Sequence, residues 1–161
     1  MGEYEIRRGL MNFRQTGMRQ NVYPVRDFWI LEDCYNAAPE SMQAALKVLS
    51  QVAEGKGGRK IAVLGEMREM GNYSEIGHRT VGKAAAELPV DLLFTFGKEA
   101  SYIAQSAIEN GVSVDQVECY EELAAPESLA EALKDTVKTG DVILFKASRA
   151  VALERVIALL K

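Results

Sequence analysis

The sequence predicts an α/β fold with three layers, in which a mostly parallel, Rossmann-like sheet carries helices on both faces. Strand-like and helix-like runs alternate from residue 28 to the end of the chain. Such alternation is typical of parallel sheets whose strands are joined by helices. The strand-like runs are almost continuously apolar, as burial on both faces requires. Glycines at Gly97, Gly111 and Gly140 mark junctions between runs.

The expected elements come in strand–helix pairs. In such sheets ligands bind at the carboxyl ends of the strands, beside a switch point in strand order, so a site is expected in the loops that leave the strands. Leu129, Ala132 and Leu133 lie near helical spacing in the fourth helix. The strands are expected at residues 28–32, 60–64, 91–96, 114–120 and 141–146, and the helices at residues 41–53, 75–88, 98–110, 128–138 and 149–160.

Residues 1–27 differ from the rest of the chain. They are basic and mixed in composition, without a strong period. We expect them to be the end of a preceding domain and a linker, and residues 28–161 to form one domain.

Composition excludes several classes of protein. Apolar residues make up 48 % of the 161 residues, charged residues 26 %, and the net charge is −4. These values are typical of a globular domain and do not favour a nucleic-acid-binding or polybasic membrane surface. No apolar run approaches the roughly 20 residues of a transmembrane helix. Cys34 and Cys119 match no metal or redox spacing. Together with the absence of a signal-peptide pattern, they favour reduced thiols in the cytoplasm.

The loop between the first strand and helix reads EDCYNAAPESM. Pro39 suits the first helical turn, because its fixed φ fits there and it lacks an N–H that would be unpaired. Asp33 and Asn36 then lie near a helix N-terminus, where exposed N–H groups favour an anion. The alternative is that both residues only cap a turn.

Two further loops are rich in polar residues. Residues 65–78 include Glu66, Arg68 and the only histidine, His78, which is more often structural than catalytic when no second histidine or cysteine accompanies it. Lys146, Ser148 and Arg149 surround the start of the last helix, with Ser148 expected as its N-cap. Two uncompensated cations at a helix N-terminus are locally unfavourable, which predicts an anion site there. A capped helix with solvated charges is the alternative.

Together these loops resemble the C-terminal domain of the Mur ligases. The chain contains no GxxxxGK[ST] phosphate loop and no GxGxxG motif after a strand. The family's motifs are matched by GMR at residues 17–19, DCYNAAPESM at 33–42, GEMREMG at 65–71 with His78, and KASR at 146–149. The sequence departs from the family pattern at Ala38, Glu66, Ala147 and Ala150.

Within the family, the chain resembles most the members that add D-alanyl-D-alanine to UDP-N-acetylmuramoyl-tripeptide during peptidoglycan precursor synthesis. The resemblance implies an enzyme of three domains, in which a central domain carries the phosphate loop and the Mg²⁺ ligands, and ATP activates a carboxylate as an acyl phosphate. It implies that this chain acts with an N-terminal and a central domain and is inactive alone. The implied contacts are Arg19, Asp33 and Asn36 for ATP, Glu66 and His78 for substrate, and Lys146, Ser148 and Arg149 as catalytic residues.

Two alternatives to this function stay open. A related ligase domain with another acceptor, similar to folylpolyglutamate synthase, has the same fold, but the YNAAP pattern favours the first assignment. A non-catalytic binding module is the other alternative, favoured by alanines at positions 38, 147 and 150.

Overall fold

The structure, a computed structural model, describes residues 20–161 and contains one six-stranded sheet with the order β1-β2-β6-β3-β4-β5. Five strands are parallel, and β1 pairs with β2 in the antiparallel direction. The predicted mostly parallel sheet is therefore confirmed. The strands are β1 (Asn21–Val25), β2 (Phe28–Asp33), β3 (Lys60–Gly65), β4 (Leu92–Phe96), β5 (Val117–Tyr120) and β6 (Val142–Lys146).

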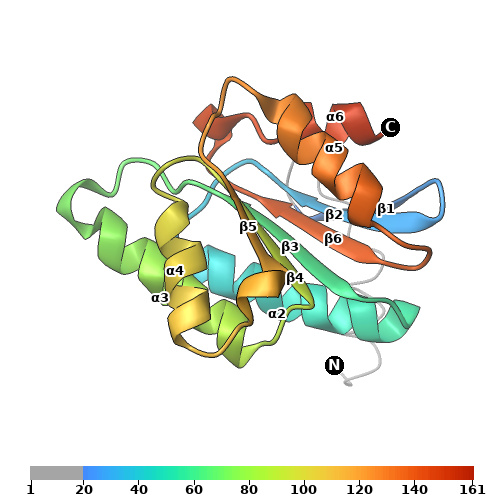
Figure 1. Ribbon diagram of the computed structural model, residues 1–161, viewed down its shortest axis with the longest axis horizontal. Helices are drawn as coiled ribbons and strands as arrows, with labels where there is room; N and C mark the ends of the chain where they lie inside the picture. The colour runs from blue at the N-terminus through green and yellow to red at the C-terminus, as the bar shows by residue number, and fades with distance from the viewer. Residues whose placement is uncertain (1–19) are drawn as a thin grey trace, which may run out of the picture.

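Helices cover both faces of the sheet, as predicted (Figure 1). Side chains of α2, α3 and α4 pack with Leu31, Leu64 and Leu144 in one core, whereas α5 and α6 pack with Ile30, Val63 and other residues in the second core. No helix in residues 20–161 is long and apolar enough to cross a membrane. The helices are α2 (Pro39–Lys56), α3 (Ser74–Glu87), α4 (Ser101–Glu109), α5 (Pro126–Thr136) and α6 (Glu154–Leu160), with 3₁₀ turns η1 (Gly71–Tyr73), η2 (Val114–Gln116) and η3 (Arg149–Val151).

The structure differs from the sequence prediction in three places. Strand β1 lies within residues 1–27, where no strand was predicted. The predicted strand at 114–120 begins with η2, and only its second half is extended. The predicted helix at 149–160 is divided into η3 and α6 by Ala152, which has a φ of 54°.

Arg155 explains how the chain tolerates the break between η3 and α6. Its guanidinium donates hydrogen bonds to the carbonyl oxygens of Val151, Ala152 and Leu123. The carbonyl groups of Val151 and Ala152 at the break therefore have a charged donor, and that of Ala152 also accepts the Arg155 N–H. The break turns Val151 and Leu153 into the core beside α6.

Strand β6 creates two switch points in the sheet. It lies between β2 and β3, although it follows both in the chain. The loops after β2 and β3 lead to helices on one face, and the loop after β6 leads to the other face. The three loops therefore diverge at the carboxyl end of β6, where ligands bind in sheets of this class.

Candidate functional site

The loops after β2, β3 and β6 bring six of the eight predicted site residues to this edge of the sheet. Asp33 ends β2 and Asn36 follows it, Glu66 follows β3, Lys146 ends β6, and Ser148 and Arg149 follow it. His78 lies on α3 behind the β3 loop. Arg19 lies outside the described residues.

Lys146 and Asp33 form a buried ion pair. They are register partners on the last rung between β6 and β2, so their side chains leave the sheet side by side. Lys146 Nζ lies 2.9 Å from Asp33 Oδ2 and 2.9 Å from the carbonyl oxygen of Asn36, and the two side chains are 3 % and 8 % exposed. The prediction that Lys146 is an uncompensated cation is therefore wrong, because a carboxylate and a carbonyl already neutralise it.

The β2 loop is held by local hydrogen bonds as well. Asn36 Oδ1 accepts a hydrogen bond from the Ala37 N–H at 2.9 Å, which is a turn-capping role. Pro39 occupies the first turn of α2, as predicted. The N-cap is Ala38, whose N–H donates to Ser41 Oγ at 3.0 Å. The carboxylate of Asp33 pairs with Lys146, so the turn-capping alternative holds for Asn36 alone.

Ser148 connects the β6 loop to the β3 loop in both directions. Its N–H donates to the carbonyl oxygen of Glu66 at 3.0 Å, and its Oγ accepts the Arg68 N–H at 2.8 Å. Ser148 does occupy the N-cap position, as predicted, but it precedes the 3₁₀ turn η3 and its hydroxyl makes no cap hydrogen bond. The two loops thus form one rigid unit.

Arg149 is exposed at the same edge. Its guanidinium lies 5.7 Å from the centroid of the Tyr35 ring, which follows β2. Arg149 begins a three-residue 3₁₀ turn, and the α-helix that follows starts with the acid Glu154. The predicted combination of cations with an α-helix N-terminus is therefore not formed, and of the two predicted cations only Arg149 is exposed to solvent.

Glu66 is buried at the end of β3 and organises the neighbouring strand. Its Oε1 accepts the Glu99 N–H at 3.1 Å, and its Oε2 lies 2.9 Å from Arg68 Nε. Gly97, with a φ of 111°, leaves room for it, since a Cβ there would lie 2.5 Å from the Glu66 side chain. Gly65 is required for a related reason, because its Cβ would lie 2.6 Å from that of Ala147.

His78 is fully buried and holds the β3 loop from below. Nε2 accepts the Met67 N–H at 3.0 Å, and Nδ1 lies 2.6 Å from the carbonyl oxygen of Ser74. A carbonyl only accepts, so the proton is on Nδ1 and the ring is neutral. Both nitrogens are occupied, which supports the structural alternative for this histidine.

Cys34 lies beneath the site, on the opposite face of β2 from Asp33. Its Sγ is 3.5 Å from the carbonyl oxygen of Phe145. Burial raises the pKa of the Cys34 thiol, and the nearby Glu32 and Glu154 carboxylates raise it further. The thiol is therefore held protonated as a core group. Both cysteines are free, and Cys119 is exposed.

Sequence reasoning did not assign Arg68, Glu99 or Tyr35 to the site. Arg68 lies in a loop that was singled out, but nothing in its sequence context separates it from a solvated charge. Glu99 enters only through its backbone N–H. Such a backbone contact depends on the packing of β4 beside β3. It cannot be predicted from the type of residue in the sequence.

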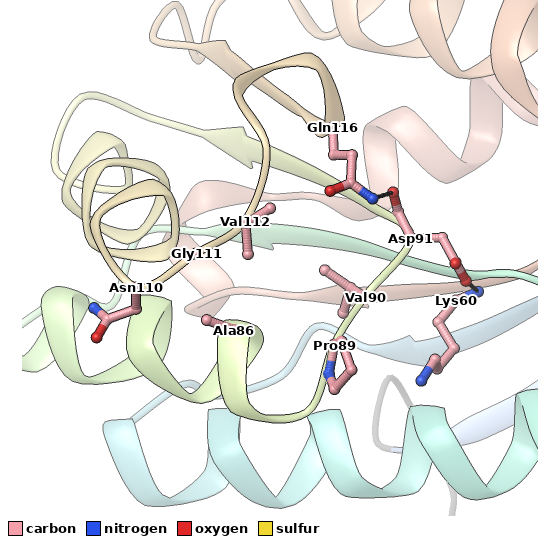
Figure 2. Close-up of a pocket in the computed structure, with 9 residues that line it drawn as sticks. All are labelled: Lys60, Ala86, Pro89, Val90, Asp91, Asn110, Gly111, Val112 and Gln116. Carbon is pink, nitrogen blue, oxygen red and sulfur yellow. Dashed lines mark hydrogen bonds between the residues drawn. The ribbon is translucent and has the colours of Figure 1, made fainter.

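A cavity of about 330 Å³ lies at the opposite edge of the sheet (Figure 2). Lys60 starts β3 and Asp91 precedes β4, so the cavity faces the amino ends of these strands. Asp91 is committed to the fold, because its carboxylate accepts the Lys60 N–H and its carbonyl accepts from Gln116. The polar residues of the predicted site lie at the carboxyl ends of the strands. Their charges and hydrogen-bonding groups favour that edge over the cavity as the candidate site. Within residues 20–161 no group of three His, Cys, Asp or Glu side chains could hold a metal ion.

The chain is similar to several ligases of known sequence or structure. UDP-N-acetylmuramoyl-tripeptide–D-alanyl-D-alanine ligase of Bacillus subtilis (strain 168) is 37 % identical over 151 residues, which are 93 % of this chain and 32 % of that protein. The crystal structure of MurF ligase from Thermotoga maritima in complex with ADP superposes with a TM-score of 0.74 at 32 % identity, covering 92 % of this chain and 31 % of that one.

A more distant structure shares the fold alone. It is the bifunctional folylpolyglutamate synthase/dihydrofolate synthase from Yersinia pestis, with 18 % identity and a TM-score of 0.58, covering 99 % of this chain and 35 % of that one. The chain thus spans about a third of the length of the relatives it matches. The profile of the family described as "Mur ligase, glutamate ligase domain" matches residues 18–149. This chain belongs to the Mur ligase family and corresponds to the C-terminal domain of these enzymes.

Proposed function

We propose that the chain is the C-terminal domain of an ATP-dependent ligase that joins D-alanyl-D-alanine to UDP-N-acetylmuramoyl-tripeptide in peptidoglycan precursor synthesis. The reaction activates the tripeptide carboxylate as an acyl phosphate, which the dipeptide amine attacks. The other two-thirds of the enzyme supply the UDP-sugar site and the phosphate loop. The chain alone is inactive in this proposal.

One observation carries the proposal beyond family membership. Three separate sequence motifs meet at the switch points around β6, where hydrogen bonds and an ion pair join their loops. A module that only maintained the fold would need no such convergence of charge at this edge. The identity of 37 % to the B. subtilis ligase supports the acceptor, and the ADP in the T. maritima complex supports a nucleotide as a substrate of the complete enzyme.

The contacts of each residue separate the proposed roles. Arg149 is exposed and presents its guanidinium to the transferred phosphoryl group. Asn36 keeps its amide N–H groups for the nucleotide, since Oδ1 is used within the loop. Lys146 positions Asp33 and the β2 loop, so its effect on the reaction passes through them. Arg19, which lies outside the described residues, stays a proposed contact of the ATP phosphates.

The remaining predicted residues position loops. Ser148 fixes the β6 loop against the β3 loop, and His78 fixes the β3 loop against α3. Glu66 is buried and reaches the acceptor through Arg68.

The described residues fit a Mg²⁺ ion poorly, since no cluster of ligands exists among them. We propose that the ion required by the phosphoryl chemistry is held by the other domains. A cytoplasmic location follows from the proposed use of ATP.

The test is a ligation assay with the complete enzyme, in which phosphate release and the amide product are both measured. The expected result is product that requires ATP, UDP-N-acetylmuramoyl-tripeptide and D-alanyl-D-alanine. Product with a folate and glutamate instead would favour the second ligase class. Ligand binding without any turnover would favour the non-catalytic module.

A further inference from the structure

We infer that Arg68 is the residue that recognises the carboxylate of the acceptor dipeptide. The inference rests on the proposed function and deepens it, because it assigns to one side chain the choice of an acceptor with a free carboxyl end. Arg68 is absent from the set of residues implied by the motifs, and its case depends on the geometry of the β3 loop.

The guanidinium of Arg68 is oriented by its buried neighbour. Nε lies 2.9 Å from Glu66 Oε2, and the Glu66 side chain is 7 % exposed, whereas that of Arg68 is 46 % exposed. Glu66 is itself fixed, since Oε1 accepts the Glu99 N–H. Glu66 is the only ion-pair partner of Arg68 within residues 20–161. The Nε side of the guanidinium is thus anchored by Glu66. The two terminal nitrogens can bind a planar anion from solvent.

The backbone of Arg68 is fixed independently. Its N–H donates to Ser148 Oγ at 2.8 Å, and the Ser148 N–H returns a hydrogen bond to the carbonyl oxygen of Glu66. On the other side, Glu69 has a φ of 62° and Gly71 a φ of 54°. A positive φ at a non-glycine residue is unfavourable and is concentrated at functional loops. The hydrogen bonds with Ser148 therefore hold the backbone at Arg68, and the chain leaves it through an unfavourable conformation at Glu69.

The position of Arg68 along the sheet matches the acceptor side of the reaction. Arg149 lies over Tyr35 and so extends toward the β2 loop, where Asp33 and Asn36 are proposed to meet the nucleotide. Arg68 extends from the β3 loop, on the other side of β6. An acyl phosphate formed beside Arg149 would be attacked from the β3 side, with the carboxylate of the dipeptide directed toward Arg68.

The chemistry of the two groups is complementary. The dipeptide has an amine that attacks and a carboxylate that takes no part in bond formation. A guanidinium anchored through Nε offers two parallel N–H donors to the two oxygens of such a carboxylate. Because Glu66 neutralises part of the charge, selection depends on this geometry more than on long-range attraction.

The experiment compares two acceptors in the complete enzyme. D-alanyl-D-alanine and D-alanyl-D-alaninamide have the same attacking amine, but only the first has a carboxylate. In Arg68→Ala, kcat/KM for the dipeptide should fall on the order of 10- to 100-fold, mainly through KM, as for loss of one charged hydrogen-bonded pair. The value for the amide should change less than about 3-fold, and the KM for ATP should stay the same.

Two further variants serve as controls. Arg68→Lys keeps the charge without the fork and should recover only part of the loss. Arg79→Ala removes another arginine that is bound through Nε to a carboxylate, Glu75 at 3.0 Å, on the exposed side of α3, and should leave both acceptors unchanged. Melting temperatures of all three variants establish that they are folded.

The outcomes separate the two proposals. An equal loss for both acceptors would mean that Arg68 only maintains the loop, and no loss would mean that it does not touch the acceptor; either result overturns the inference and leaves the proposed function intact. If the wild-type enzyme ligates neither acceptor, the proposed function fails and the inference fails with it.

Discussion

The two ends of the sheet contain the same types of interaction and use them differently. At the amino end, Arg59 pairs with the buried Asp141, and Lys56 lies 3.6 Å from the centroid of the Trp29 ring. At the carboxyl end, Lys146 pairs with Asp33, and Arg149 lies over Tyr35. An ion pair with a buried carboxylate therefore lies at each end of strand β6, and the type of residue does not tell which end is the site.

The two ends differ in how completely their charged groups are paired within the fold. Asp141 accepts two hydrogen bonds from Arg59 and one from the Lys138 N–H, and Arg59 donates another to the carbonyl oxygen of Thr136. These partners all belong to neighbouring turns. At the carboxyl end the partners come from loops that diverge at a switch point, and two guanidinium groups, on Arg68 and Arg149, remain accessible. Position relative to strand direction is therefore what favours the carboxyl end as the candidate site.

The largest expected effect is at Lys146. Lys146→Ala leaves the Asp33 carboxylate buried without its partner, so we expect the free energy of unfolding of this chain to fall by about 3–5 kcal/mol. This corrects the expectation of an unfavourable cation, which predicts a stability that is nearly unchanged or slightly raised. Urea unfolding of the variant and of wild type measures the difference.

A double replacement separates stability from function at this pair. Asp33→Asn with Lys146→Met removes both charges, and the double variant should recover most of the lost stability, because no buried charge is left without a partner. In the complete enzyme it should stay defective in ligation. Recovery of a normal rate would show that the carboxyl-end pair is structural, like the pair of Arg59 and Asp141.

The second expected effect concerns the two cations that lie over aromatic rings. Arg149→Ala in the complete enzyme should lower the ligation rate on the order of 10²-fold, as for a charge contact made near the transition state. Its stability should change by less than about 0.5 kcal/mol, since the side chain is exposed. Lys56→Ala is the matched variant at the amino end, and its rate should equal that of wild type. A similar loss of rate in both variants would remove the functional distinction between the ends.

The fold was predictable because it follows from local patterns. Continuous apolar runs such as KIAVL and DVILFK are typical of a strand buried on both faces. The structure places both in the centre of the sheet. Strand β1 was not predicted, because NVYPV contains a proline and lies at the edge, where exposure hides the apolar pattern.

The site was predictable in location but not in bonding. The strand-end rule brings Asp33, Glu66 and Ser148 to one edge without knowledge of the tertiary structure. The pairing of Lys146 with Asp33 depends on β6 entering between β2 and β3, which no local pattern specifies. The break at Ala152 also depends on a contact that is distant in the sequence, between Arg155 and the carbonyl oxygen of Leu123. Alanine itself normally continues a helix.

A smaller effect is expected at Ser148. Ser148→Ala removes the acceptor of the Arg68 N–H, so the free energy of unfolding should fall by about 1 kcal/mol. Thr139→Ala is the matched variant at the amino end. Its exposed hydroxyl donates to Asp27, and the loss should stay below about 0.5 kcal/mol. Equal losses in urea unfolding would show that the hydrogen bond between the β6 and β3 loops contributes no more than an exposed one.

The smallest expected effect is a pH dependence from Cys34, the thiol under the carboxyl end. Burial raises its pKa in the folded state, so the folded thiol stays protonated while the thiol of the unfolded chain ionises near pH 8.5. The contribution is complete below this pH and is lost as the pH rises, since ionisation favours the unfolded state. Between about pH 7 and about pH 8.5 the loss is about 0.4 kcal/mol. Cys34→Ala should have a smaller free energy of unfolding than wild type at both pH values. Its free energy of unfolding should fall less between the two pH values, by about 0.4 kcal/mol. If the two proteins lose the same free energy over this interval, the thiol is accessible to water, and the carboxyl end of the sheet is hydrated beneath Asp33 as well as above it.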